Sequence, residues 1–218
     1  MVDIYASEAE QIESLKKIWR EYGVAIVVGV LLALLVSFGW RYYQHRREHN
    51  LEHASMRYEQ LLTNVVNGNT QAVEIQANRL ITRYPHTPYA EFAALQLARQ
   101  DVYVWNLADA ENKLRWVIKH GDNVALREIA RIRLARVLLA ENQPQQALDL
   151  LKQTDDTAYA AAAREVEGDA LLALGKPDEA RTAYQNALKA FPGFEVIRPL
   201  LQMKLDDLAG PAQTGASK

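Results

Sequence analysis

The chain has 218 residues, 49% of them hydrophobic, which is enough to bury the core of one or two domains. Its formal net charge of −2 argues against a nucleic-acid-binding protein, because neutralising phosphates requires an excess of basic side chains. The sequence contains no cysteine, so a disulfide scaffold, a thiolate zinc site and thiol catalysis are all excluded.

Residues 1–23 are predicted to form an N-terminal arm with one short amphipathic helix. Ser7 followed by Glu10 is a capping-box start, in which the two side chains satisfy free backbone N–H groups. Apolar side chains then recur at helical spacing, at Ile12, Leu15, Ile18, Trp19 and Tyr22. We expect a helix over residues 7–22 that either rests on a membrane surface or serves as a docking helix for a partner.

Residues 24–43 are predicted to cross a membrane as an uncleaved anchor. Residues 24–40 carry no charge and only one polar side chain, and seventeen helical residues rise roughly 25 Å. Aromatic side chains suited to the two membrane interfaces flank this stretch, and the bulky residues after it do not suit a signal peptidase. Three basic residues precede the span and three follow it, so charge does not predict its orientation.

The span carries a stripe of small residues. Ala25, Gly29, Ala33 and Ser37 recur at every fourth position and therefore lie along one ridge of the helix. Such a ridge lets another helix backbone approach closely, which predicts a packing face for a membrane partner. Chance alignment is the alternative, because small residues are common in membrane spans.

Three histidines follow the span at four-residue spacing. His45, His49 and His53 spell H-x-x-E-H twice, a pattern used by some zinc proteases. A protease also needs a third ligand and a substrate cleft, and Arg46 and Arg47 would repel a cation. We therefore expect a solvated linker helix, with a membrane-proximal metallohydrolase as the remote alternative. No phosphate-binding loop or nucleophile motif occurs, so the sequence predicts no enzyme and no cofactor.

Residues 44–208 are predicted to form an all-α domain of repeated helical hairpins. Helical runs alternate with short breaks, and the break at Asn142-Gln143-Pro144 recurs 33 residues later at Gly175-Lys176-Pro177. The segment starting at Trp105 fits the same frame, displaced by 37 residues. This spacing and the small residues in each unit resemble the tetratricopeptide pattern, whose period is ~34 residues. The positions expected to define the repeats are Ala98, Ala110, Ala135, Ala147, Gly168, Gly175, Ala180, Tyr184, Ala187 and Pro192.

Three or four stacked hairpins are expected, because a single hairpin cannot bury its own apolar face. A degenerate leading hairpin would pair residues 58–66 with residues 70–84. A final helix over about residues 195–208 would cap the stack, and residues 209–218 are small and polar enough to be disordered. The predicted architecture is thus a single transmembrane helix followed by a tetratricopeptide-like α-solenoid.

The whole arrangement resembles the YfgM family of proteobacterial inner-membrane proteins. The residues that carry the resemblance are Arg20-Glu21-Tyr22-Gly23, Gly39-Trp40-Arg41-Tyr42-Tyr43, Tyr89-Ala90 through Leu97-Ala98, and Leu134-Ala135-Arg136. The resemblance implies a cytoplasmic N-terminus, a periplasmic repeat domain, and association with the SecYEG translocon and the membrane-anchored chaperone PpiD. It also implies contact with lipid and a supporting role in handling newly exported chains. The alternative is the same scaffold facing the cytoplasm as an assembly or signalling adaptor.

The partner-binding surface is expected on the concave face, which the first helix of each tetratricopeptide hairpin lines. Arg99, Arg136 and Asp169 occupy one equivalent row of that face, and Gln96 and Arg133 lie beside it. Two stacked arginines suit a carboxylate or the backbone carbonyls of a bound segment. The alternative is that these side chains form salt bridges within the stack, to Glu128, Glu165 or Asp169. Among the aromatic residues, core packing is the default for Phe92 and Tyr103, and Trp105 is the one expected to be exposed.

Overall fold

The computed structural model describes residues 4–154, 159–190 and 198–208, and every secondary-structure element in these ranges is an α-helix. The predicted all-α class is therefore confirmed. The chain divides into two compact units, Met1–Asn50 and Leu51–Lys218. The expected proline of the last repeat, Pro192, the start of the predicted final helix and the predicted disordered tail all lie outside the described residues.

Helix α1, Ile4–Val66, is one continuous helix. The predicted short helix over residues 7–22 is its first part rather than a separate element, because a lone glycine such as Gly23 weakens a helix without breaking it. The apolar span and the first helix of the repeat domain are therefore parts of one helix.

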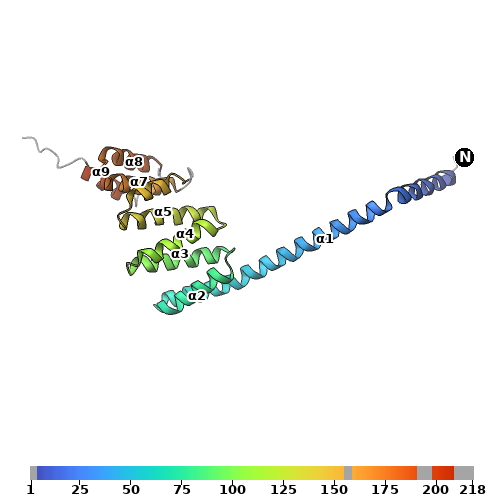
Figure 1. Ribbon diagram of the computed structural model, residues 1–218, viewed down its shortest axis with the longest axis horizontal. Coiled ribbons are helices and arrows are strands. Elements are labelled where there is room, and N and C mark those ends of the chain that lie inside the picture. Colours follow the sequence, from blue (N-terminus) through green and yellow to red (C-terminus); the bar gives the residue numbers. More distant parts are fainter. Residues whose placement is uncertain (1–3, 155–158, 191–197, 209–218) are drawn as a thin grey trace, which may run out of the picture. The chain divides into compact units, whose positions relative to one another are not determined.

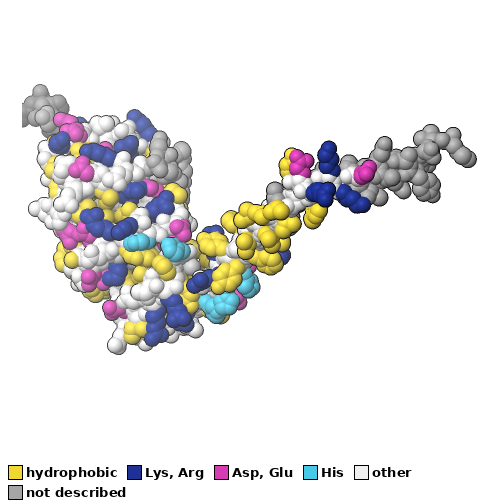
Figure 2. Space-filling model, turned by 45° about the vertical axis from the view of Figure 1, so that its right-hand side comes forward, with side chains coloured by type: hydrophobic (Ala, Val, Ile, Leu, Met, Phe, Trp, Pro, Cys, Tyr) yellow, Lys and Arg dark blue, Asp and Glu magenta, His cyan; other side chains and the backbone are white. Residues whose placement is uncertain are grey.

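The apolar part of α1 has the properties of a membrane span. Within the described residues α1 is the single helix long and apolar enough to cross a bilayer, by length and composition, and its best window has a mean hydropathy of 2.5. Only 7% of that window is buried, whereas the core helix of a soluble protein is mostly buried. Figure 2 shows these hydrophobic side chains gathered along α1, with charged side chains beyond them toward the N-terminus.

The described helices that follow residue 50 form successive antiparallel hairpins (Figure 1). The end of α1 packs with α2, and the later helices pair as α3 with α4, α5 with α6 and α7 with α8, followed by α9. The described chain therefore holds four hairpins and a final helix, as the repeat frame predicts. The bounds are α2 Thr70–Arg83, α3 Pro88–Tyr103, α4 Leu107–His120, α5 Val124–Ala140, α6 Pro144–Leu151, α7 Ala160–Ala173, α8 Pro177–Ala190 and α9 Arg198–Leu208.

The turn inside each hairpin has the same geometry. In all four, one residue adopts a left-handed backbone, with φ of 69° at Gly68, 61° at Trp105, 60° at Asn142 and 72° at Gly175. The next residue then donates its N–H to the carbonyl five residues earlier, which is the Schellman closure of a helix. Glycine and asparagine are the usual residues at this position, so the tryptophan is the exception.

Small side chains let the helices of each hairpin approach closely. The repeat positions Ala98, Ala110, Ala135, Ala147, Ala180 and Ala187 are buried, and a side chain at Gly168 would collide with a neighbour. A Cβ atom at Gly168 on α7 would lie 2.3 Å from Cε1 of the Tyr184 ring on α8. Tyr184 is itself fully buried and donates its hydroxyl to Asp169 Oδ1 at 2.7 Å.

A buried carboxylate joins neighbouring hairpins. Glu91 on α3 is buried, and its Oε1 accepts the backbone N–H groups of Asp122 and Asn123 in the α4–α5 connection. Its Oε2 lies beside Gly121, where a Cβ atom would be 3.0 Å away. Glu91 therefore fixes the start of α5 against α3, the two helices that face each other across the pocket described next.

Candidate functional site

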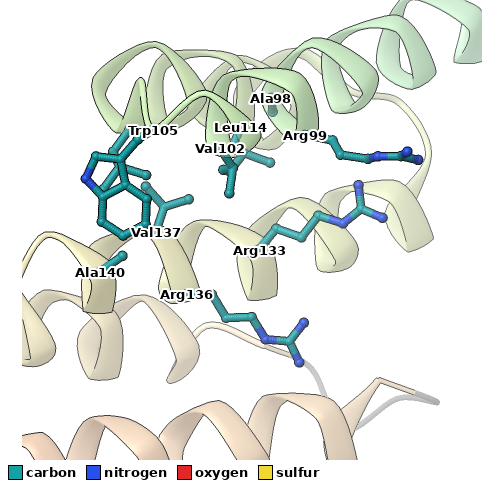
Figure 3. A pocket seen from close by; sticks show the side chains of 10 residues that line it. Ala98, Arg99, Val102, Trp105, Leu114, Arg133, Arg136, Val137 and Ala140 are labelled. Atoms are coloured by element: carbon teal, nitrogen blue, oxygen red, sulfur yellow. The ribbon is translucent and has the colours of Figure 1, made fainter. Parts of the chain in front are cut away.

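A pocket of about 240 Å³ opens between α3, α4 and α5 (Figure 3). Two hairpins build it, because α3 and α4 form one hairpin and α5 begins the next. Most of its lining is apolar, and three arginines complete it. The lining residues are Ala98, Arg99, Val102, Trp105, Leu107, Leu114, Arg133, Arg136, Val137 and Ala140.

The arginines gather on one side of the pocket. Arg99 extends from α3 and Arg133 and Arg136 from α5, and Figure 3 shows the Arg99 and Arg133 guanidinium groups directed into the same space. Burial and then the positive charges of Arg136 and Arg99 lower the pKa of Arg133. Like charges are therefore held together here, which costs folding free energy unless an anion binds.

Only one of the three arginines forms an ion pair within the residues that the structure describes. Arg136 donates to Glu165 Oε2 on α7 at 3.3 Å, with half of the arginine side chain exposed. For Arg136, the structure therefore shows the salt bridge within the stack that the sequence analysis gives as the alternative to partner binding. Arg99 and Arg133 have neither an ion pair nor a hydrogen bond to any residue in the described ranges.

The opposite side of the pocket is aromatic and aliphatic. The Trp105 ring lies near Val137 and Ala140, away from the guanidinium groups (Figure 3). Trp105 is 71% exposed, so core packing does not account for its position. Its left-handed backbone costs about 1–2 kcal/mol in a residue other than glycine, and such strain is concentrated at functional sites.

The remaining predicted concave-face residues lie outside this pocket. Gln96 is half-buried on α3, and Asp169 on α7 belongs to a polar network. In that network Lys204 on α9 donates to both Asp169 oxygens, at 2.7 and 2.9 Å, and to Glu165 Oε1 at 3.0 Å. Asp169 and Glu165 thus hold α9 against α7, and a role for Asp169 in binding a partner stays a prediction.

Two aromatic residues differ from the expectation of core packing. Tyr103 is 90% exposed, and Phe92 is partly exposed while its ring contacts that of Tyr58 at a centroid distance of 5.7 Å. Tyr103 lies in the last turn of α3, where the chain turns away from the core. With Val104 and Trp105 it forms an exposed apolar rim beside the pocket, which the sequence pattern did not identify as a unit.

The predicted membrane ridge lies on α1. Gly29, Ala33 and Ser37 are exposed, and a Cβ atom added at Gly29 would meet no other atom within 4 Å among the described residues. The side chain of Ala25 lies outside the described set. The ridge is therefore accessible at its described positions, and its use by a partner stays a prediction.

The three histidines that follow the span all lie on α1. Across the described ranges, no three His, Asp or Glu side chains are grouped so as to hold a metal ion. His45, His49 and His53 keep four-residue spacing along the helix, as the sequence indicated.

Comparison with known proteins gives a family for most of the chain. Residues 16–210 match the family described as a tetratricopeptide repeat-like domain. A protein of Escherichia coli (strain K12) named ancillary SecYEG translocon subunit is 29% identical over 208 residues, covering 95% of this chain and 100% of the relative. A protein of the same name from Haemophilus influenzae is 29% identical over 205 residues, covering 94% and 99%.

A solved structure supports the fold. The crystal structure of a thermophilic TPR protein from Thermus thermophilus superposes with a TM-score of 0.50 and 21% identity, covering 70% of this chain and 81% of that one. The resemblance to the YfgM family stated from the sequence is confirmed by the relatives. With the match covering most of its length, the chain belongs to the family of tetratricopeptide repeat-like domain proteins.

Proposed function

We propose that this chain is a single-pass inner-membrane protein that associates with the SecYEG translocon and presents a helical-repeat scaffold to other proteins of export. The observation that carries the proposal is the similarity, over 95% of the chain, to a protein named ancillary SecYEG translocon subunit. The exposed apolar stretch of α1 supports a membrane anchor, and four hairpins supply a rigid surface for binding.

The proposal places the N-terminus in the cytoplasm and the repeat domain in the periplasm, next to a PpiD-like chaperone and newly exported chains. Confinement in one bilayer would raise the effective concentration of such partners, so modest contacts would be enough for association. A protease added to spheroplasts tests this topology. Digestion of the repeat domain supports the periplasmic placement, and its protection would favour the cytoplasm-facing adaptor.

Co-purification tests the association itself and the role of the ridge. The tagged full-length chain, extracted in mild detergent, should recover SecYEG. Gly29→Leu should reduce that recovery several-fold, because a leucine on the ridge keeps a partner helix at a distance. Gly29→Ala is a matched control at the same position, because alanine already stands on the ridge at Ala33 and still lets a partner helix approach closely.

Absence of SecYEG from the wild-type preparation would refute the association, and equal recovery with both variants would refute the ridge. Replacement of His45, His49 and His53 together by alanine should leave recovery unchanged. Loss of function in that variant, with a retained fold, would instead favour the metallohydrolase alternative.

A further inference from the structure

The pocket between α3, α4 and α5 joins two different surfaces within one cavity. Trp105, Val137 and Ala140 form its apolar side, and Arg99 and Arg133 its cationic side (Figure 3). On α5, Arg133 and Val137 are one helical turn apart, roughly 6 Å along the axis. A ligand that fills the cavity therefore meets an apolar wall and a pair of positive charges about one turn apart.

Trp105 occupies a position where a smaller residue would cost the fold less. The three equivalent turns of the stack place Gly68, Asn142 and Gly175 at this left-handed position. The tryptophan adds little buried surface in return, because most of its side chain is exposed. The fold of this chain therefore gives no reason for a tryptophan at this position, and tryptophan is one of the residues enriched among binding hot spots.

The two arginines without a carboxylate partner indicate the charge of the ligand. Arg99 and Arg133 come from different hairpins and repel each other, and within the described ranges no acidic side chain pairs with them. A carboxylate placed between them would receive charge-assisted hydrogen bonds from both guanidinium groups. Arginine is also enriched at hot spots, next to tryptophan.

Resting on the function proposed above, we propose that this pocket binds a segment of a partner protein in which a large apolar side chain stands beside carboxylates. The apolar side chain contacts Trp105 and Val137, and a carboxylate bridges Arg99 and Arg133. A cavity of about 240 Å³ with a fixed cationic side selects one such sequence rather than unfolded chains in general. Residues 209–218 of this chain are not the occupant, because they contain neither an acidic nor a large apolar side chain.

A labelled peptide tests the proposal with the full-length chain in neutral detergent micelles. The probe is the N-acetylated, C-amidated peptide Ser-Asp-Leu-Asp-Ser with an uncharged coumarin, followed by fluorescence anisotropy. Blocked termini ensure that only side-chain carboxylates are available. Saturable binding is expected, with at least about a tenfold loss when both aspartates of the peptide are replaced by asparagine.

Three variants of the chain locate the binding. Arg133→Gln and Trp105→Gly should each weaken binding at least about tenfold, whereas Arg79→Gln, the same charge change at an exposed arginine of α2, should have little effect. The Arg133→Gln chain should no longer distinguish the aspartate peptide from the asparagine peptide. Trp105→Gly should keep its melting temperature within about 4 °C of wild type, because relief of strain offsets the small loss of buried surface.

Equal effects of Arg133→Gln and Arg79→Gln would overturn the proposal, because the attraction would then be general. Two other occupants would overturn it as well. One is anionic lipid, recognised by binding of phosphatidylglycerol vesicles that Arg133→Gln abolishes. The other is a second copy of the chain, recognised by self-association that Trp105→Gly abolishes.

The peptide assay contains no translocon, so it can fail while SecYEG still co-purifies with the wild-type chain. Conversely, the peptide can bind even if SecYEG is not recovered. The two results therefore separate a failure of the pocket's assignment from a failure of the proposed function.

Discussion

Replacing Gly168 by alanine should destabilise the repeat domain, although alanine is normally the better helix residue. The added Cβ would lie 2.3 Å from Cε1 and 2.5 Å from Cδ1 of the Tyr184 ring, well inside contact distance. The ring is buried and cannot retreat without disturbing its hydroxyl bond to Asp169. Because the ring is rigid, either α7 and α8 move apart or that bond is lost.

The magnitude follows from opposing contributions. Overpacking of this kind costs about 1–3 kcal/mol, and loss of a hydrogen bond to a carboxylate costs about 1.5–3 kcal/mol where the ring shifts. Replacing glycine inside a helix contributes about 1 kcal/mol in the opposite direction. We expect a net loss of about 2 kcal/mol, which corresponds to a fall in melting temperature of about 4–8 °C for a chain of this size.

Circular dichroism of the full-length chain in micelles measures this melting temperature, and a double-mutant cycle identifies its cause. In the Tyr184→Leu background the ring atoms nearest Gly168 are absent, so Gly168→Ala should be neutral or stabilise the fold by up to about 1 kcal/mol. The same destabilisation in both backgrounds would refute the reasoning, since the ring contact would not be its source.

Two further predictions concern charged groups. Lys204→Met should lower the free energy of unfolding by about 1–3 kcal/mol, because it removes the cation between Glu165 and Asp169. The control Lys176→Met breaks an exposed ion pair with Glu179 and should change the melting temperature by less than about 2 °C. Burial raises the pKa of the Glu91 carboxyl above its ordinary value, so the contribution of this carboxyl to stability falls as pH rises through its pKa in the folded state and is constant above that pKa. In urea unfolding from pH 4 to 8, Glu91→Gln should therefore gain stability relative to wild type as pH rises, and a difference that does not vary with pH would contradict the assignment.

The hairpin boundaries could be predicted because they depend on local chemistry. Proline starts α3, α6 and α8 at Pro88, Pro144 and Pro177, where its missing N–H is not needed. Asn142 and Gly175 end the preceding helices in a conformation that suits them. These residues act on their immediate neighbours, so a periodic spacing of such signals predicts the stack.

Contacts between distant segments could not be predicted in this way. Lys204 meets Asp169 35 residues away, and residues 191–197 between their helices carry no signal for that register. Likewise, the repeat frame places Arg99 and Arg136 in one row and offers Glu128, Glu165 and Asp169 as partners, but which of them pairs with Arg136 depends on how neighbouring hairpins pack. Repeat spacing aligns positions without specifying which side chains touch.

Trp105 is an intermediate case, because the alignment of the repeats in the sequence already shows an unusual residue at this turn position. The alignment places it at the same position as Asn142 and Gly175, both of which commonly adopt a left-handed backbone. Tryptophan is disfavoured in the left-handed backbone of this position. In the same pocket, the positive charges of Arg99 and Arg133 repel each other. Packing elsewhere in the stack must offset both costs. Two independent departures from the locally favoured choice, on opposite sides of one cavity, are better explained by a shared ligand than by the requirements of the fold.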